Sequence, residues 1–189
     1  MPVLSTIKMT ARQFLRLGED PPGVRLELVD GGVAVSPSPR LPHSNVDKQL
    51  TIIVGAYIKM HDLGLLGGDV DTVLSEVDVR RPDLFYFEKS RAQHLDPSDA
   101  IRETPDLCVE IISPSSGVID REDKFEQYAS AGVPHYWLID PEEKTIEAFV
   151  LRDGSYQLAA EGHDKDVVHL PPFPDLAIPL GDLWLPSRP

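Results

Sequence analysis

Two acidic residues and a lysine near the middle of the chain have the types and surroundings that metal-dependent phosphodiester chemistry requires. Asp83 stands at the start of an apolar run that ends at Phe87, and Glu110 lies inside a second apolar run. Lys124 follows on the next element. Two carboxylates can hold a divalent cation, and an amine beside them can stabilise the negative charge that develops on a reacting phosphate. We therefore treat these three residues as a candidate catalytic site.

Side-chain alternation in strands decides whether the two carboxylates can meet. Asp83 shares a strand face with Phe85, and Glu110 shares one with Cys108. If the two strands are neighbours, both carboxylates come together near the strand ends. Two buried anions side by side are costly unless a cation lies between them. Mg²⁺, which prefers oxygen ligands and retains waters, is the natural candidate.

Lys124, which carries the amine, lies about one turn into a helix predicted from Arg121 to about Ala131. From there Lys124 can point back toward the C-terminal end of the strand that carries Glu110, and Tyr128 falls on the same helix stripe. The alternative places Lys124 on the surface and gives both acids ordinary loop partners. The three residues together favour the catalytic interpretation.

Composition sets the broad class. With 189 residues, 41% hydrophobic and 26% charged, the chain predicts one globular domain over residues 1–189. The only cysteine is Cys108, so no intramolecular disulfide can form and a cytoplasmic setting is expected. The first ten residues contain no long apolar segment, and no run reaches the roughly 18 apolar residues of a membrane span, so neither a signal peptide nor a membrane helix is expected.

The net charge of -13, from 31 acidic and 18 basic residues, does not suggest a strong nucleic-acid binder. A local basic cluster surrounds Asp83: Arg80, Arg81, Lys89 and Arg91. These residues form either a phosphate-facing patch or ordinary solvated loop charges, and the sequence leaves both interpretations open.

The N-terminal part predicts a short helix and a hairpin. Thr10 and Gln13 have capping-box spacing, so a helix begins there and runs to about residue 17. Residues 24–29 alternate as a strand and return through Asp30-Gly31-Gly32 into residues 33–35. Glu27 falls mid-strand on the polar face. It is either a solvated carboxylate on an edge strand or an acid of the catalytic site, and the sequence leaves both interpretations open.

A long helix should follow a proline-dense loop over residues 36–42. The apolar spacing from Val46 to Ile58 indicates one buried helix face, and Gly64 ends the helix. His43 precedes this helix, where it either binds a metal or phosphate or simply packs and caps.

The rest of the chain alternates strands with one helix and ends in a hairpin and a proline-rich tail predicted to wrap in extended form. Strands are expected over residues 70–74, 81–87, 107–112 and 136–139, with a hairpin of 145–151 and 156–160. This order predicts an α+β fold with a mixed sheet flanked by helices, and an N-terminal helix and hairpin.

Several motifs together resemble a known family. They are Arg81-Pro82-Asp83, Pro105-Asp106-Leu107-x-x-Glu110-Ile111-Ile112-Ser113-Pro114-Ser115, Asp120-x-x-x-Lys124-x-x-x-Tyr128, Gly132-Val133-Pro134-x-Tyr136-Trp137-Leu138-Ile139-Asp140-Pro141 and Glu27-Leu28-Val29-Asp30-Gly31. The pattern resembles the Uma2 (Uma-two) family of restriction-endonuclease-like proteins, a branch of the PD-(D/E)xK nuclease-like superfamily. The likeness covers roughly residues 10–180.

The resemblance implies a restriction-endonuclease-like core and a divalent-metal phosphodiesterase site. By the family pattern Asp83 and Glu110 would hold Mg²⁺ or Mn²⁺, with the Ile111 carbonyl as a third ligand. The superfamily's usual lysine, two residues after the acid, is replaced here by Ile112, and Lys124 takes its part.

The same resemblance matches Glu27 to an acid that reaches the site, and it implies a homodimer. One departure concerns the segment after the proline-dense loop: relatives carry a histidine followed by glutamine, whereas Ser44 follows His43 here. This departure weakens any catalytic role assigned to His43.

Three functions follow from these observations. The leading hypothesis is a Mg²⁺-dependent endonuclease acting on DNA, with Asp83, Glu110 and Lys124 in the roles above. The second is a catalytically inactive nuclease-fold protein that binds protein partners through its acidic surface. The third is a nuclease for RNA or for short or damaged substrates, because an acidic chain should grip long duplex weakly.

Overall fold

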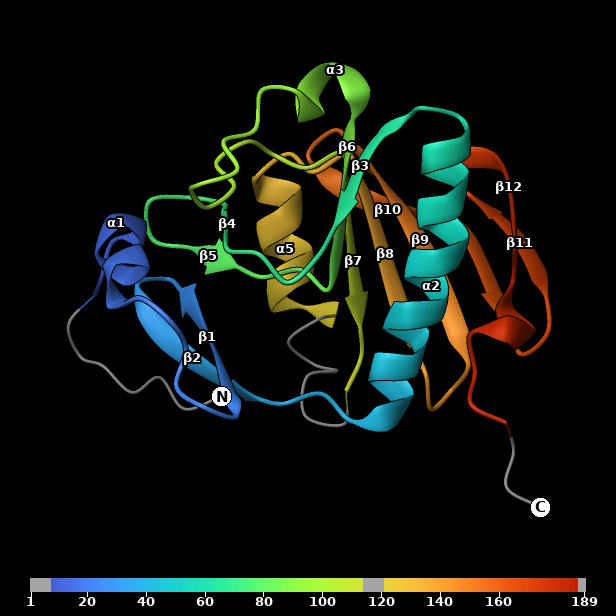
Figure 1. Ribbon diagram of the computed structural model, residues 1–189, viewed down its shortest axis with the longest axis horizontal. Helices are drawn as coiled ribbons and strands as arrows, with labels where there is room; N and C mark the ends of the chain where they lie inside the picture. The colour runs from blue at the N-terminus through green and yellow to red at the C-terminus, as the bar shows by residue number, and fades with distance from the viewer. Residues whose placement is uncertain (1–7, 114–120, 187–189) are drawn as a thin grey trace.

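A computed structural model describes residues 8–113 and 121–186. A six-stranded mixed sheet of order β10-β9-β8-β7-β6-β3 lies at the centre (Figure 1). A four-stranded sheet of order β2-β1-β5-β4 lies beside it, and β11 and β12 form a third, two-stranded sheet. The predicted α+β class, with an N-terminal helix and hairpin, is confirmed.

The strands and helices have the following bounds. The strands are β1 (Val24–Val29), β2 (Gly32–Pro37), β3 (Gly64–Gly67), β4 (Thr72–Val73), β5 (Val79–Arg80), β6 (Leu84–Glu88), β7 (Leu107–Ile111), β8 (His135–Asp140), β9 (Thr145–Arg152), β10 (Ser155–His163), β11 (Val167–Leu170) and β12 (Phe173–Pro179). The helices are α1 (Ala11–Phe14), α2 (Leu41–Met60), α3 (Lys89–Ala92) and α5 (Asp123–Ser130), with 3₁₀ turns η1 (Leu15–Leu17) and η2 (Leu180–Asp182).

The central sheet is antiparallel except at β7 and β8, which run parallel. Parallel neighbours need a crossover connection, and the chain between them contains α5. The helices α5 and α2 cover opposite faces of the sheet (Figure 1). The C-terminal end of β7 therefore lies between two helical layers.

One face of the sheet packs against α2 as the helical spacing predicts. The buried residues of α2 are Val46, Leu50, Val54 and Ile58, and they join the largest apolar cluster. The tail joins this cluster as well through Leu170, Phe173 and Ile178. The prediction of an extended wrapping tail is therefore wrong in part, because β11 and β12 pair with each other and close this side of the core.

The other face packs against α5 through an aromatic cluster. Tyr128 is fully buried and Phe125 lies edge-on to Tyr136, Phe149 and Tyr156. Gly132 follows the helix with a φ of 80°, the left-handed conformation that favours glycine after a helix C-terminus. The predicted C-terminal end of this helix is confirmed, whereas Asp120, its predicted cap, lies outside the described residues.

The start of α2 differs from the prediction. The helix begins at Leu41 rather than near Val46, with Pro42 in its first turn and no side-chain cap at Arg40. Proline is tolerated there because the first amides of a helix have no intrahelical acceptor. The early start places His43 on the helix instead of in a loop.

The strands around Asp83 also differ from the prediction. The strand expected over residues 81–87 begins only at Leu84, as β6, which pairs with β3 and β7. The residues just before the expected strand form β5, which was not predicted and which pairs with β1 and β4. Asp83 therefore lies in the link between the two sheets, directly before β6. The strand β3 was not predicted, and the strand expected over residues 70–74 shortens to β4.

The N-terminal predictions hold. Thr10 and Gln13 form the capping box of α1, and β1 has the predicted bounds.

Within the described ranges, no helix is long and apolar enough to span a membrane.

Candidate active site

Three elements bring Asp83, Glu110 and Lys124 together. Leu84 of β6 pairs with Val109 of β7, so the next position along places Asp83 opposite Glu110. Lys124 comes from the first turn of α5, which covers the same face. Asp83 and Lys124 are each 7% exposed and Glu110 is 1% exposed. Neighbouring strands were the condition for the two carboxylates to meet, and β6 and β7 are neighbours.

Both carboxylate oxygens of Glu110 accept hydrogen bonds from α5. Lys124 Nζ donates to Oε2 at 2.6 Å, and Tyr128 Oη donates to Oε1 at 2.7 Å. The two donors are four residues apart, so a single helix stripe presents both. Burial and the charge of Glu110 raise the pKa of Tyr128 well above its ordinary value, so this residue stays a hydrogen-bond donor.

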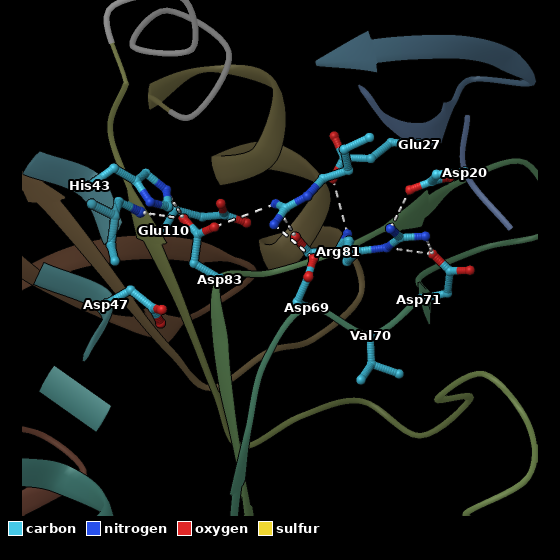
Figure 2. A network of polar contacts seen from close by, with 12 residues as sticks. Asp20, Glu27, His43, Asp47, Asp69, Val70, Asp71, Arg81, Asp83 and Glu110 are labelled. Atoms are coloured by element: carbon cyan, nitrogen blue, oxygen red, sulfur yellow. Dashed lines mark hydrogen bonds and ion pairs between the residues drawn. The ribbon is translucent and has the colours of Figure 1, made fainter. Parts of the chain in front are cut away.

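Asp83 is held from three sides (Figure 2). Its Oδ2 accepts from the Ile111 amide at 2.8 Å and contacts His43 Nε2 at 3.1 Å. Its Oδ1 lies 3.4 Å from Arg25 Nη1. Burial alone would raise the pKa of Asp83, but the His43 hydrogen bond and the nearby positive charges lower it. These contacts therefore favour the ionised form of the carboxylate.

Glu27 is the third buried acid, at 3% exposure. Arg80 Nη1 donates to its Oε2 at 3.2 Å, and the Arg81 amide donates to its Oε1 at 3.0 Å. Burial opposes ionisation, but the charges of Lys124 and Arg80 prevail and lower the pKa of Glu27. The solvated-edge interpretation of Glu27 is wrong.

The positive charge of Lys124 lowers the pKa of both Glu27 and Asp83 while its Nζ contacts Glu110. The four candidate side chains named from the sequence therefore share one electrostatic environment. The Ile111 main chain joins them through its amide contact with Asp83.

Sequence reasoning did not find the parts played by Arg80 and Gln127. Arg80 has no exposed surface, and its Nε donates to Gln127 Oε1 on α5 at 2.6 Å. Together with its bond to Glu27, Arg80 joins the N-terminal hairpin to the helix that carries Lys124. Arg25 was also missed, although it shares a strand face with Glu27 and period-2 spacing could have singled it out.

The predicted basic cluster is not a free phosphate-facing patch. Arg80 is paired with Glu27, Lys89 with Asp62 and Arg91 with Asp106. Arg81 lies between Asp20 and Asp71, as Figure 2 shows. Each of the four positive charges already has a carboxylate partner within the chain.

A pocket of about 350 Å³ opens beside Asp83, between the first turns of α2 and the β3–β4 connection. His43, Ser44 and Thr51 line it from the helix, and Gly67 and Gly68 line it from the connection. Asp83 lines the pocket as well, beside the imidazole of His43.

The donor atoms fit a hard divalent cation. Asp83 and Glu110 are carboxylates on adjoining strands, and the Ile111 main chain lies against Asp83. Within residues 8–113 and 121–186, no group of three His, Cys, Asp or Glu side chains is arranged to hold a metal. Two carboxylates with retained waters and substrate oxygens suit Mg²⁺, which seldom has a cage made only of protein ligands.

The family model described as putative restriction endonuclease, Uma2, matches residues 11–181. The chain belongs to the Uma2 family. This match covers the hairpin, the central sheet and every candidate residue above. Proteins of restriction-endonuclease-like families generally use divalent metals, in agreement with the donor set.

A solved structure has the same fold. The crystal structure of a putative nuclease belonging to DUF820 from Anabaena variabilis superposes with a TM-score of 0.76 at 21% sequence identity. The likeness covers 93% of this chain and 97% of that one. None of the curated proteins matches this Uma2 chain. Family and fold together support a nuclease.

Proposed function

We propose that this Uma2 protein is a divalent-metal-dependent endonuclease that hydrolyses phosphodiester bonds in nucleic acid, with DNA as the first substrate to test. The observation that carries the proposal is the buried constellation of Asp83, Glu110 and Lys124 at the end of β7. Burying three ionisable groups in one place is costly for stability, so their retention favours a chemical role over a packing role.

Asp83 and Glu110 would hold Mg²⁺ or Mn²⁺, together with the Ile111 carbonyl. When bound, such a cation neutralises charge on the phosphate and lowers the pKa of a coordinated water. The part of the protein is to favour the ionised form of Asp83, which the hydrogen bonds and positive charges around it do by lowering its pKa. Glu27 supports the site from the hairpin side through Arg80.

Lys124 has the role of electrostatic catalyst. Its ammonium group stands 2.6 Å from Glu110 and is almost shielded from water, where a positive charge acts strongly on a developing oxyanion. Tyr128 holds the other oxygen of Glu110 and so limits how this carboxylate can rotate.

The charges of the site explain how a cation and a substrate would enter together. Glu27, Asp83 and Glu110 are balanced by Arg25, Arg80 and Lys124, three negative against three positive charges. A divalent cation alone would add two uncompensated positive charges, and a phosphodiester bound beside it would cancel one of them. We therefore expect metal affinity to rise when a phosphate group is present.

The test combines calorimetry with cleavage. Mg²⁺ and Mn²⁺ are titrated into wild type, Asp83→Asn and Glu110→Gln, each with and without a phosphodiester oligonucleotide, and plasmid cleavage is measured on the same samples. Glu143→Gln, an exposed turn residue, is the matched control. Wild type and control should bind metal and cut, and the two site variants should do neither. Cleavage that survives in both site variants would contradict the proposal.

A partner-binding protein without catalysis is the second candidate. It is favoured by the net charge of -13 and by the carboxylate partners of all four basic residues around Asp83. If metal binding is absent with and without oligonucleotide, and no nucleic acid is cut, this candidate replaces the nuclease. The homodimer stays a prediction, which sedimentation of the purified protein would check.

A further inference from the structure

The pocket beside Asp83 has a size and a lining that identify what it could receive. We propose that it takes an unpaired nucleobase next to the scissile phosphate, so that the substrate is a single strand or a duplex with a base out of its stack. This inference rests on the proposed nuclease function and names the substrate class of that same site.

Size excludes a duplex from the pocket. The cavity measures about 350 Å³, which lies at the lower end of the roughly 300–1,000 Å³ that small-molecule sites occupy. One nucleoside-sized group fits such a volume, whereas a base that stays paired and stacked inside its duplex cannot enter a pocket in the protein. Enzymes that modify a single base receive it unpaired in a snug pocket, so a protein pocket can hold one base outside its stack.

The charges of the pocket favour a base over a second phosphate. Its positive groups are already paired, Arg25 with Asp69 and Asp83, and Lys48 with Asp47. Three carboxylates therefore face two cations, which repels an extra anion. The ring and amino N–H groups of a base are neutral, and they can donate hydrogen bonds to such carboxylates.

The walls suit a flat ring. Leu66, Leu84 and Pro39 supply apolar surface, and His43 adds an aromatic side chain. The glycine pair at the end of β3 adds a wall of main chain: a Cβ on Gly68 would lie 2.1 Å from the Asp83 carbonyl oxygen. This close approach keeps the pocket directly beside Asp83, so a base inside it would place its own phosphate at the candidate site.

The test measures binding without hydrolysis. Fluorescein-labelled oligonucleotides are titrated with the full chain in Ca²⁺ buffer and followed by anisotropy: a single strand, the matching duplex, the duplex with one bulged base, and the same bulge with an abasic residue. Base stacking in a protein site typically contributes about tenfold in affinity. We expect the single strand and the bulged duplex to bind about tenfold more tightly than the paired duplex and the abasic bulge.

Two variants on one helix turn locate the effect. Thr51→Trp places a much larger side chain in the lining of the pocket, whereas Ile52→Trp changes a residue that is 62% exposed and is not part of that lining. Only the first should abolish the preference for the bulged base. The abasic substrate keeps the test decisive even if Thr51→Trp folds poorly.

Each result separates this inference from the proposed function. Equal binding of bulged and abasic duplex, or tighter binding of the paired duplex, overturns the base pocket while Asp83-dependent cleavage would still stand. Failure of every oligonucleotide to bind or be cut overturns both.

Discussion

At the scale of single residues, the two oxygens of Glu110 show how the site is balanced. One oxygen accepts from Lys124 and the other from Tyr128, and both donors are buried. The ammonium group of Lys124 thus holds a carboxylate that we propose as a metal ligand. Lys124 competes with the cation for Glu110, and it is also the charge that would serve the reaction.

This competition leads to a prediction for Lys124→Met. Cleavage should fall by about 100-fold or more, because a preorganised charge beside the phosphate is lost. Metal affinity measured by calorimetry should stay or rise, because Glu110 no longer has its ammonium partner. Lys165→Met, at an exposed position, is the control. Loss of metal binding in Lys124→Met would contradict this account of Glu110.

The hydroxyl of Tyr128 can be tested against a matched residue. Tyr128→Phe and Tyr156→Phe each remove one buried hydroxyl, the first from Glu110 and the second from the Val133 carbonyl. Each should lower the free energy of unfolding by about 1–2 kcal/mol in denaturant titrations. Only Tyr128→Phe should also slow cleavage, by about tenfold, because Glu110 gains rotational freedom. Equal cleavage rates in both variants would make Tyr128 a packing residue only.

At the scale of elements, a buried polar network connects the hairpin to α5. Glu27 of β1 binds Arg80 of β5, and Arg80 binds Gln127, which lies about one helical turn after Lys124 on α5. Gln127 also donates to Asp78, which in turn accepts from the Asp30 amide in the hairpin turn. The small sheet thereby helps to orient the helix that carries Lys124.

Acid titration should reveal this network. The folded-state pKa of Glu27 lies below its ordinary value of 4.5, so its stabilisation is fully present above that pH and is lost as the pH falls through the folded pKa. Glu27→Gln leaves Arg80 buried without its anion and should cost about 3 kcal/mol near neutral pH.

The difference in unfolding free energy between wild type and Glu27→Gln should shrink as the pH drops below 4.5. Glu161→Gln, the same change at an exposed strand position, should show no such convergence. Urea unfolding at several pH values measures both. If the difference in unfolding free energy between wild type and Glu27→Gln does not change with pH, Glu27 does not contribute to acid sensitivity.

The elements also show how far the sequence predicts this protein. Helical spacing, capping residues and apolar runs correctly identified α1, β1, α5, β7 and β8, because these signals are local. The strand β3 was not predicted because its four residues, Gly64–Gly67, include two glycines and no β-branched residue.

The polar partners of the site were harder to predict than the site acids. Alternation shows that Arg25 and Glu27 share a strand face, yet it does not show that this face meets Asp83, which is 58 residues from Arg25. Arg80 was assigned to a surface cluster because no local signal reports that β5 is buried between β1 and α5. Long-range docking of the two sheets decides both cases.

At the scale of the whole molecule, the acidic net charge limits how nucleic acid can be held. The four basic residues around Asp83 each have a carboxylate partner, and so does Arg25. A protein that grips duplex through six to ten phosphates shows a steep decrease of affinity with salt, with a log–log slope of about −5 to −9. This chain has no comparable basic surface near the site among its described residues.

We therefore predict a shallow salt dependence for the binding of oligonucleotides. The logarithm of the association constant, measured by anisotropy between low and physiological salt, should fall with log salt at a slope of about −2, as for contacts with about two phosphates. Arg81→Ala should leave this slope unchanged, because Asp20 and Asp71 already neutralise that residue. A slope steeper than about −5 would mean that these ion pairs open to bind phosphates, and duplex would then become the expected substrate.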